Sequence, residues 1–236
     1  MSLKPSRELN RPLPGERDWT PERGVVWYWY DFLCPFCYVG QDRTAILRCH
    51  GLEVVNLPLQ IHPEIPCGGI AAGPRRGAMY ERLEQETREA GLELHWPPRL
   101  PFSRPALTAA EWVRANEPAA FPALHRALFR AHFVLGENIE LNSVIEGHAA
   151  ASGVLLPRLR AAMADGSAEA ALERAESSAH TTGVRGAPAW LIGRELISGL
   201  QPRETFEYLA RATSSEGPAN SAYKTGCSST VAQRKH

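Results

Sequence analysis

The feature that most constrains this chain is a pair of cysteines standing between a strand-like run and a helix-like run. Val25 to Tyr30 is a continuous series of β-branched and aromatic residues, typical of a central strand covered on both faces. Cys34 and Cys37 follow, and residues 38–48 are helix-compatible up to a stop at Gly51. This order predicts two cysteines one turn apart at the start of a helix.

Such a pair is suited to thiol–disulfide exchange. The unpaired N–H groups and the positive end of the helix dipole stabilise a thiolate on the first cysteine. We therefore expect Cys34 to be the attacking thiolate and Cys37 to be the resolving thiol, which displaces whatever Cys34 has captured. This chemistry requires no metal and no cofactor.

A zinc half-site is the alternative for a single C-x-x-C pair. A zinc ribbon needs a second such pair or two histidines, whereas this chain offers only Cys49-His50 and an isolated Cys67. We expect Cys49 to pack in the core, as free cysteines often do, and leave Cys67 and Cys227 as exposed thiols or a second disulfide. Five cysteines, an odd number, favour catalytic use of one pair over a framework of structural disulfides.

The rest of the sequence predicts an α/β fold with a helical insertion. Residues 55–61 alternate apolar and polar side chains, and Pro58 cannot donate a ladder hydrogen bond, so this strand is expected at a sheet edge. Residues 188–192 and 195–198 are typical of two short strands, and a helix is expected from 202 to 212. Several apolar stripes at helical spacing lie between the early and late strands, which predicts a subdomain of helices.

Charge and hydropathy exclude several functions. Lys+Arg and Asp+Glu both number 26, so no net charge recruits nucleic acid or anionic lipid. No run approaches the roughly 18 apolar residues of a membrane span, and residues 1–20 lack the apolar core of a secretory signal. We expect a cytoplasmic protein with neither a nucleic-acid partner nor a membrane partner.

Two motifs together resemble the DsbA family of thioredoxin-fold proteins. They are the strand that leads into Cys34-Pro35-Phe36-Cys37 and the segment GVRGAP at residues 183–188. The form DFLCPFCYVG at residues 31–40 is especially similar to the cytosolic FrnE-like branch, which is related to 2-hydroxychromene-2-carboxylate isomerases and kappa-class glutathione transferases. The resemblance covers about residues 24–212.

The resemblance implies a thioredoxin-like fold with an inserted helical subdomain. The expected parts are a mobile leader (1–23), a discontinuous thioredoxin-like domain (24–67 and 184–213), a helical insertion (68–183) and a disordered tail (214–236).

The resemblance also implies a set of site residues. It implies that the Ala187–Pro188 bond is cis and lies against the cysteines, where the Ala187 backbone can bind a substrate chain in the manner of a strand. Pro35 and Phe36, between the cysteines, are also expected to contact the substrate. From the local sequence alone, Pro188 could equally open a strand where a missing N–H is harmless. Phe32, Phe36, Tyr38 and Trp190 surround the motifs and are expected to form an apolar collar, although core packing explains Trp190 equally well.

Two departures from the family pattern affect the chemistry. Phe36 stands where exported relatives carry a histidine that makes the disulfide strongly oxidising, so we expect a potential between about −270 and −120 mV. Tyr28 stands where thioredoxin-like enzymes often have a buried acid, six residues before Cys34. Asp31 is the nearest carboxylate; it is either a proton acceptor for Cys37 acting through water or a turn residue at the strand end.

Three functions are compatible with these residues. The leading one is disulfide exchange on protein or small-molecule disulfides, with glutathione among the candidate thiols. The second is a glutathione-dependent isomerase or transferase; such relatives usually carry serine at the first position, and retention of both Cys34 and Cys37 argues against it. The third is a thioredoxin-like binding or chaperone module without turnover. His125, His132 and His148 lie in the helical part and are assigned no role.

Overall fold

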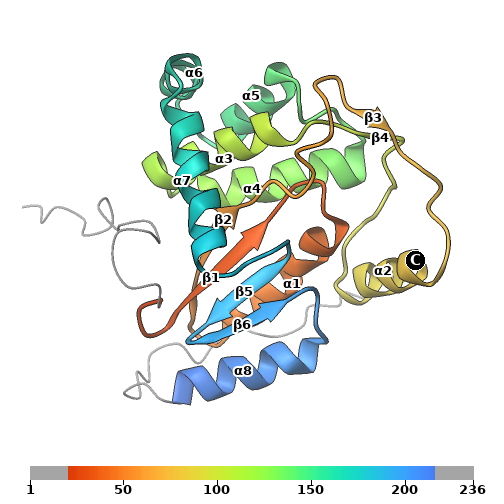
Figure 1. The fold of residues 1–236 in the computed structure, drawn as a ribbon, viewed down its shortest axis with the longest axis vertical. Helices are drawn as coiled ribbons and strands as arrows, with labels where there is room; N and C mark the ends of the chain where they lie inside the picture. The colour runs from red at the N-terminus through yellow and green to blue at the C-terminus, as the bar shows by residue number, and fades with distance from the viewer. Residues whose placement is uncertain (1–20, 216–236) are drawn as a thin grey trace, which may run out of the picture.

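The structure is a computed structural model that describes residues 21–215 (Figure 1). Its elements, in chain order, are β1 (Val25–Tyr30), α1 (Pro35–Cys49), β2 (Glu53–Pro58), β3 (Ile70–Ala71), α2 (Ala78–Glu89), β4 (Arg99–Leu100), α3 (Arg104–Asn116), α4 (Phe121–Arg130), the π-helical turn η1 (Ala131–Leu135), α5 (Asn142–Ala151), α6 (Leu156–Asp165), α7 (Ser167–Thr181), β5 (Ala189–Ile192), β6 (Glu195–Ser198) and α8 (Arg203–Ser215).

The main sheet has the strand order β2-β1-β5-β6. β1 pairs in parallel with β2 and antiparallel with β5, with Tyr28 opposite Trp190. β1 is therefore an interior strand and β2 an edge strand, as the aromatic run and Pro58 predict. β2 ends at Pro58 and does not continue to Ile61 as expected, because its partner β1 ends at Tyr30. The Leu59 N–H still donates to the Tyr30 carbonyl at 2.8 Å, but the Ile61 N–H donates to the Asp31 carboxyl group instead of to a strand.

The two faces of the sheet bury different residues of β1. Tyr28 and Tyr30 belong to the larger core together with α1, α3, α4 and α8, whereas Trp29 packs with Leu57 and with Ala179 of α7 on the other face. This alternation follows from the period of two along a strand. The full burial of both sets explains why β1 is continuously apolar.

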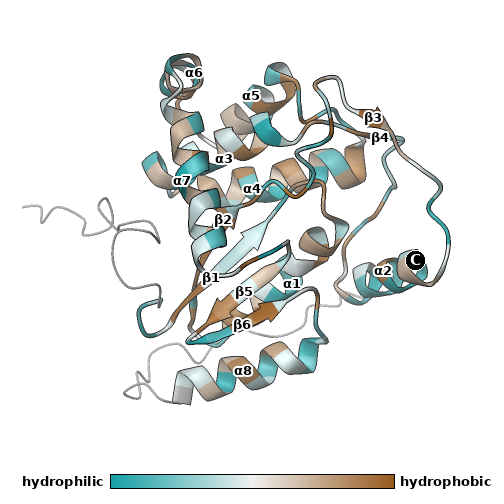
Figure 2. Ribbon diagram, viewed as in Figure 1, coloured by the Kyte–Doolittle hydropathy of each residue, from teal (hydrophilic) through white to brown (hydrophobic). Residues whose placement is uncertain are grey.

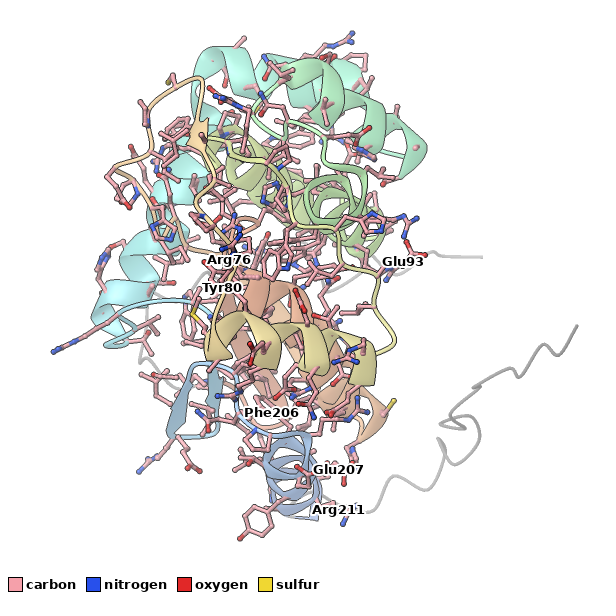
Figure 3. The ribbon with its side chains drawn as sticks, turned by 90° about the vertical axis from the view of Figure 1, so that its right-hand side faces the viewer. Arg76, Tyr80, Glu93, Phe206, Glu207 and Arg211 are labelled. Atoms are coloured by element: carbon pink, nitrogen blue, oxygen red, sulfur yellow. The ribbon has the colours of Figure 1, made fainter. Side chains whose placement is uncertain are left out.

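Helices cover the sheet on both sides. Figure 1 shows α3 to α6 gathered at one end of the molecule and α8 beside β6 at the opposite end. Phe206 on the inner side of α8 is fully buried and packs edge-on against Trp190, with ring centroids 4.8 Å apart (Figure 3). In Figure 2 α2 is mostly hydrophilic, in keeping with the burial of only Leu83 and Thr87 on that helix.

The segment between β2 and β5 is mostly helical, as expected. It also contains a small antiparallel pair, β3 with β4, which the sequence patterns did not indicate because each strand has only two residues. None of the helices between residues 21 and 215 is long and apolar enough to cross a membrane.

The cysteines outside the C-x-x-C pair lie at the surface in the part of the chain that the structure describes. Cys49 is exposed, so its assignment to the core is wrong; it lies one turn after the exposed Ala45, on the solvent-facing side of α1, whereas Leu47 in the same turn is buried. Cys67 is exposed in the loop after β2. Cys227, most of the expected leader and nearly all of the expected tail lie outside the described residues; α8 extends through Ser215, past the expected start of the tail at 214.

Candidate active site

The two cysteines lie at the N-terminus of α1. Cys34 is the N-cap residue with extended backbone angles, and Pro35 occupies the first turn, where a missing N–H is harmless. The Cys34 sulfur accepts a hydrogen bond from the Cys37 N–H at 3.4 Å, so it fills the place that a capping oxygen takes in other helices. Both cysteines are free thiols here.

The two thiols differ in burial. Cys34 is 4% exposed to solvent, whereas Cys37 is fully buried. Burial raises the pKa of the Cys37 thiol well above its ordinary value, and the hydrogen bond with the Cys34 side chain acts in the same direction. Cys37 is therefore held as a protonated thiol and needs a proton acceptor before it can attack.

The loop before β5 supplies the second half of the site. The Cys34 thiol donates to the carbonyl oxygen of Ala187 at 3.4 Å, and the Ala187–Pro188 peptide bond is cis. Backbone hydrogen bonds hold both ends of this loop. The Val184 N–H donates to the Ala179 carbonyl oxygen at 2.9 Å, and the Gly199 N–H donates to the Pro188 carbonyl oxygen at 2.8 Å. The structure thus brings together Cys34, Cys37, Ala187 and Pro188, which are far apart in the sequence.

Asp31 is a completely buried carboxyl group behind the cysteines. Its oxygens accept hydrogen bonds from the N–H groups of Leu33 at 3.0 Å and Ile61 at 2.9 Å and from the Ser103 hydroxyl at 3.3 Å. Burial raises the pKa of Asp31 in spite of these three donors. A negative charge on Asp31 also raises the pKa of Cys37, so the two groups interact electrostatically.

The phenol of Tyr28 lies beneath the first turn of α1. Its hydroxyl donates to the carbonyl oxygen of Cys37 at 3.0 Å, and its ring stacks on Trp190 with centroids 4.7 Å apart. The sequence pattern marks Tyr28 only as a position without the usual acid and does not indicate these contacts. It also missed Ser103, for which no local signal exists, because that residue comes from the start of α3.

The expected apolar collar is only partly present. Phe32 and Trp190 are fully buried in the core, and Tyr38 is buried and stacks on Phe133 with centroids 5.0 Å apart. Pro35 and Phe36 are half-buried and are the members of the motif that reach the surface beside Cys34. Of the four expected collar residues only Phe36 is therefore accessible at the surface, next to Pro35.

No hydrogen bond joins the histidines of the helical part to the cysteines among the described residues. His125 and His132 are buried, and burial lowers the pKa of each to about 3. The Nε2 atom of His148 is hydrogen-bonded to the Glu137 carboxyl group at 2.5 Å. Between residues 21 and 215 no group of three or more His, Cys, Asp or Glu side chains is arranged to hold a metal ion.

Comparisons with known proteins agree with this geometry. The family described as the DSBA-like thioredoxin domain matches residues 25–210. A comparison with curated proteins found no match.

Solved structures with the same fold include three of note. A probable DsbA oxidoreductase from Streptomyces coelicolor has a TM-score of 0.67 at 23% identity, over 83% of this chain and 92% of that one. A 2-hydroxychromene-2-carboxylate isomerase has a TM-score of 0.65 at 19% identity, over 81% and 95%. The cytosolic disulfide reductase DsbM from Pseudomonas aeruginosa, with GSH, has a TM-score of 0.54 at 20% identity, over 81% and 96%.

Proposed function

The chain belongs to the DsbA-like thioredoxin domain family, and on that premise we propose that it exchanges disulfides on protein or small-molecule substrates through Cys34 and Cys37. The family and the thioredoxin-like fold are those expected from the sequence. The observation that carries the proposal is the position of the Cys34 sulfur, which caps α1 and contacts the Ala187 carbonyl next to Pro188.

The exchange proceeds in two displacements. The Cys34 thiolate attacks one sulfur of a substrate disulfide; a Cys34–substrate bond forms, and the second substrate sulfur leaves as a thiolate that takes up a proton. Cys37 then loses its proton and attacks the Cys34 sulfur, so that the Cys34–Cys37 disulfide forms and the first substrate sulfur leaves. Two electrons pass from the enzyme dithiol to the substrate, and the reverse sequence oxidises a substrate dithiol.

Asp31 is the proposed acceptor of the Cys37 proton. Its pKa is raised by burial, which brings its basicity closer to that of a thiol, and it interacts electrostatically with Cys37. No direct hydrogen bond joins the two side chains in the described structure, so the transfer requires an intervening water or a small movement.

Substrate binding is proposed at the loop before β5. Ala187 is half-buried, so its backbone is within reach of an extended substrate chain, and Pro35 and Phe36 offer apolar surface on the other side of Cys34. Glutathione is a proposed small thiol partner. We also propose a cytoplasmic location, since a mid-sized chain with few cysteines and exposed Cys49 and Cys67 suits a reducing compartment.

The test uses insulin reduction and the refolding of a scrambled disulfide protein. Cys34→Ser is expected to abolish both activities, because no nucleophile remains, and Cys37→Ser is expected to accumulate mixed disulfides with the substrate. Cys67→Ser, an exposed cysteine in the loop after β2, is the control and should behave as wild type. Wild-type activity in both active-site variants would contradict the exchange mechanism.

A further inference from the structure

Tyr28 connects the two halves of the site. It is fully buried, its hydroxyl donates to the Cys37 carbonyl at 3.0 Å, and its ring stacks on Trp190 with centroids 4.7 Å apart at an interplanar angle of 14°. Trp190 is the residue opposite Tyr28 in the β1–β5 pairing, two positions after Pro188. The Tyr28 side chain thus contacts both Cys37, which carries the resolving thiol, and β5, the strand that follows the loop of Ala187 and Pro188.

The phenol is clamped in place by α1. A methyl group on Gly40 would come within 2.7 Å of the Tyr28 oxygen and 3.2 Å of the Trp190 ring, so the helix reaches this depth only because position 40 has no side chain. The phenol is therefore packed closely against α1, with its hydroxyl directed at the Cys37 carbonyl.

We propose that Tyr28 is a positioning residue for the resolving step: its hydroxyl fixes the backbone of Cys37 so that the Cys37 sulfur lies in line with a mixed disulfide on Cys34. This inference rests on the proposed disulfide exchange and adds to it a residue that assists the second displacement but not the first. The second displacement is the geometrically demanding one, because a buried sulfur must approach Cys34 along the axis of the bond that it breaks.

The phenol is suited to this role over a wide pH range. Burial raises the pKa of Tyr28 well above its ordinary value, and negative charge on Cys37 and Cys34 raises it further. Tyr28 consequently remains a hydrogen-bond donor when the thiols ionise.

Tyr30 provides a matched control on the same strand. It is also fully buried, lies two residues further along on the same face, and stacks on Tyr28 with ring centroids 6.0 Å apart. Its hydroxyl has no hydrogen-bond partner among the described residues. Tyr28→Phe and Tyr30→Phe therefore each remove one buried hydroxyl, but only the first removes a contact to Cys37.

The experiment follows the reaction of the reduced protein with the aromatic disulfide dithiobis(nitrobenzoate). Capture by Cys34 releases one coloured thiolate in a second-order phase, and resolution by Cys37 releases the other in a first-order phase. We expect Tyr28→Phe to slow the first-order phase about fivefold, the factor that corresponds to one lost hydrogen bond. The second-order phase should not change, and Tyr30→Phe should change neither phase.

The outcomes separate this inference from the proposed function. An unchanged first-order phase in Tyr28→Phe, or an equal loss in Tyr30→Phe, would overturn the positioning role while leaving disulfide exchange intact. Absence of both phases in the wild-type protein would instead contradict disulfide exchange itself. If Tyr28→Phe does not fold, Gly40→Ala, which displaces the phenol oxygen, is the second variant and should slow the same phase.

Discussion

The Cys34 thiol contacts the carbonyl oxygen of Ala187 at 3.4 Å, although 153 positions separate the two residues in the chain. The order of the elements explains this proximity. Only residues 31–34 separate β1 from α1, and the loop that contains Ala187 ends directly before β5. Because β1 and β5 are antiparallel neighbours in the sheet, the C-terminal end of β1 lies beside the N-terminal end of β5. The start of α1 and the end of the Ala187 loop therefore meet at this end of the two strands. The site therefore depends on the β1–β5 pairing as much as on the cysteine motif.

Asp31 is predicted to make stability fall as the pH rises. Burial raises its pKa in the folded state, so the folded protein binds the Asp31 proton more tightly than the unfolded chain does. The contribution of protonated Asp31 to the free energy of unfolding is fully present below the ordinary carboxyl pKa, near 3.9, and is lost as the pH rises through the raised pKa of Asp31 in the folded state. Urea unfolding of wild type and Asp31→Asn should show their free-energy difference shifting in favour of the variant from about pH 4 to 7. A difference independent of pH would contradict an ionising buried Asp31.

His125 is predicted to have the opposite effect. Its pKa is lowered to about 3 by burial, so below the ordinary value near 6.5 the unfolded chain takes up a proton that the folded protein excludes. The contribution of the neutral, buried His125 to the free energy of unfolding is fully present above about pH 6.5 and is lost as the pH falls toward 3. His125→Phe keeps a ring beside Tyr30 and Phe129, each within about 5 Å of the histidine ring.

The measurement for His125 is the unfolding free energy at several pH values below 6.5. The variant should lose less stability than wild type on acidification, by up to about 1.4 kcal/mol for each pH unit in that window. Parallel pH profiles for the two proteins would show that His125 takes up its proton in the folded state.

The sequence predicts the parts of this site that are local and misses those that depend on register. β1, the start of α1 and the position of Cys34 and Cys37 at that start follow from a short continuous pattern. The contacts of Tyr28 with Cys37 and of Ser103 with Asp31 do not, because they depend on how a strand lies under a helix and on where α3 begins. The sequence does not predict the exposure of Cys49, because apolar residues on both sides of it leave the solvent-facing side of the last turn of α1 undefined; Leu47 in that turn is buried and Cys49 is not.

The ion pair of Glu111 with Arg114 is predicted to be costly to break. Glu111 is fully buried and accepts two hydrogen bonds from Arg114, at 2.6 and 2.7 Å. Arg114→Met would leave a buried carboxylate without its counter-ion, which typically costs about 3–5 kcal/mol of unfolding free energy. The double variant Glu111→Leu with Arg114→Met should recover most of that loss in urea unfolding, and a double variant as unstable as the single one would contradict the explanation.

Gly40 and Tyr28 are predicted to be energetically coupled. Alanine in a helix interior is ordinarily better than glycine by up to about 1 kcal/mol, but here its methyl group would lie 2.7 Å from the Tyr28 oxygen. Such overpacking typically costs about 1–3 kcal/mol, so Gly40→Ala should destabilise the protein. In a Tyr28→Phe background the oxygen is gone, and the nearest remaining atom belongs to Trp190 at 3.2 Å.

A double-mutant cycle measured by urea unfolding tests this coupling. Gly40→Ala should cost at least about 1 kcal/mol less in the Tyr28→Phe background than in wild type, because the two substitutions act on one contact. Independent sites would instead give additive losses within about 0.5 kcal/mol. Additivity would mean that the helix moves away from the sheet at Gly40, and the phenol would then not be clamped against Cys37 as its contacts with the helix and Trp190 indicate.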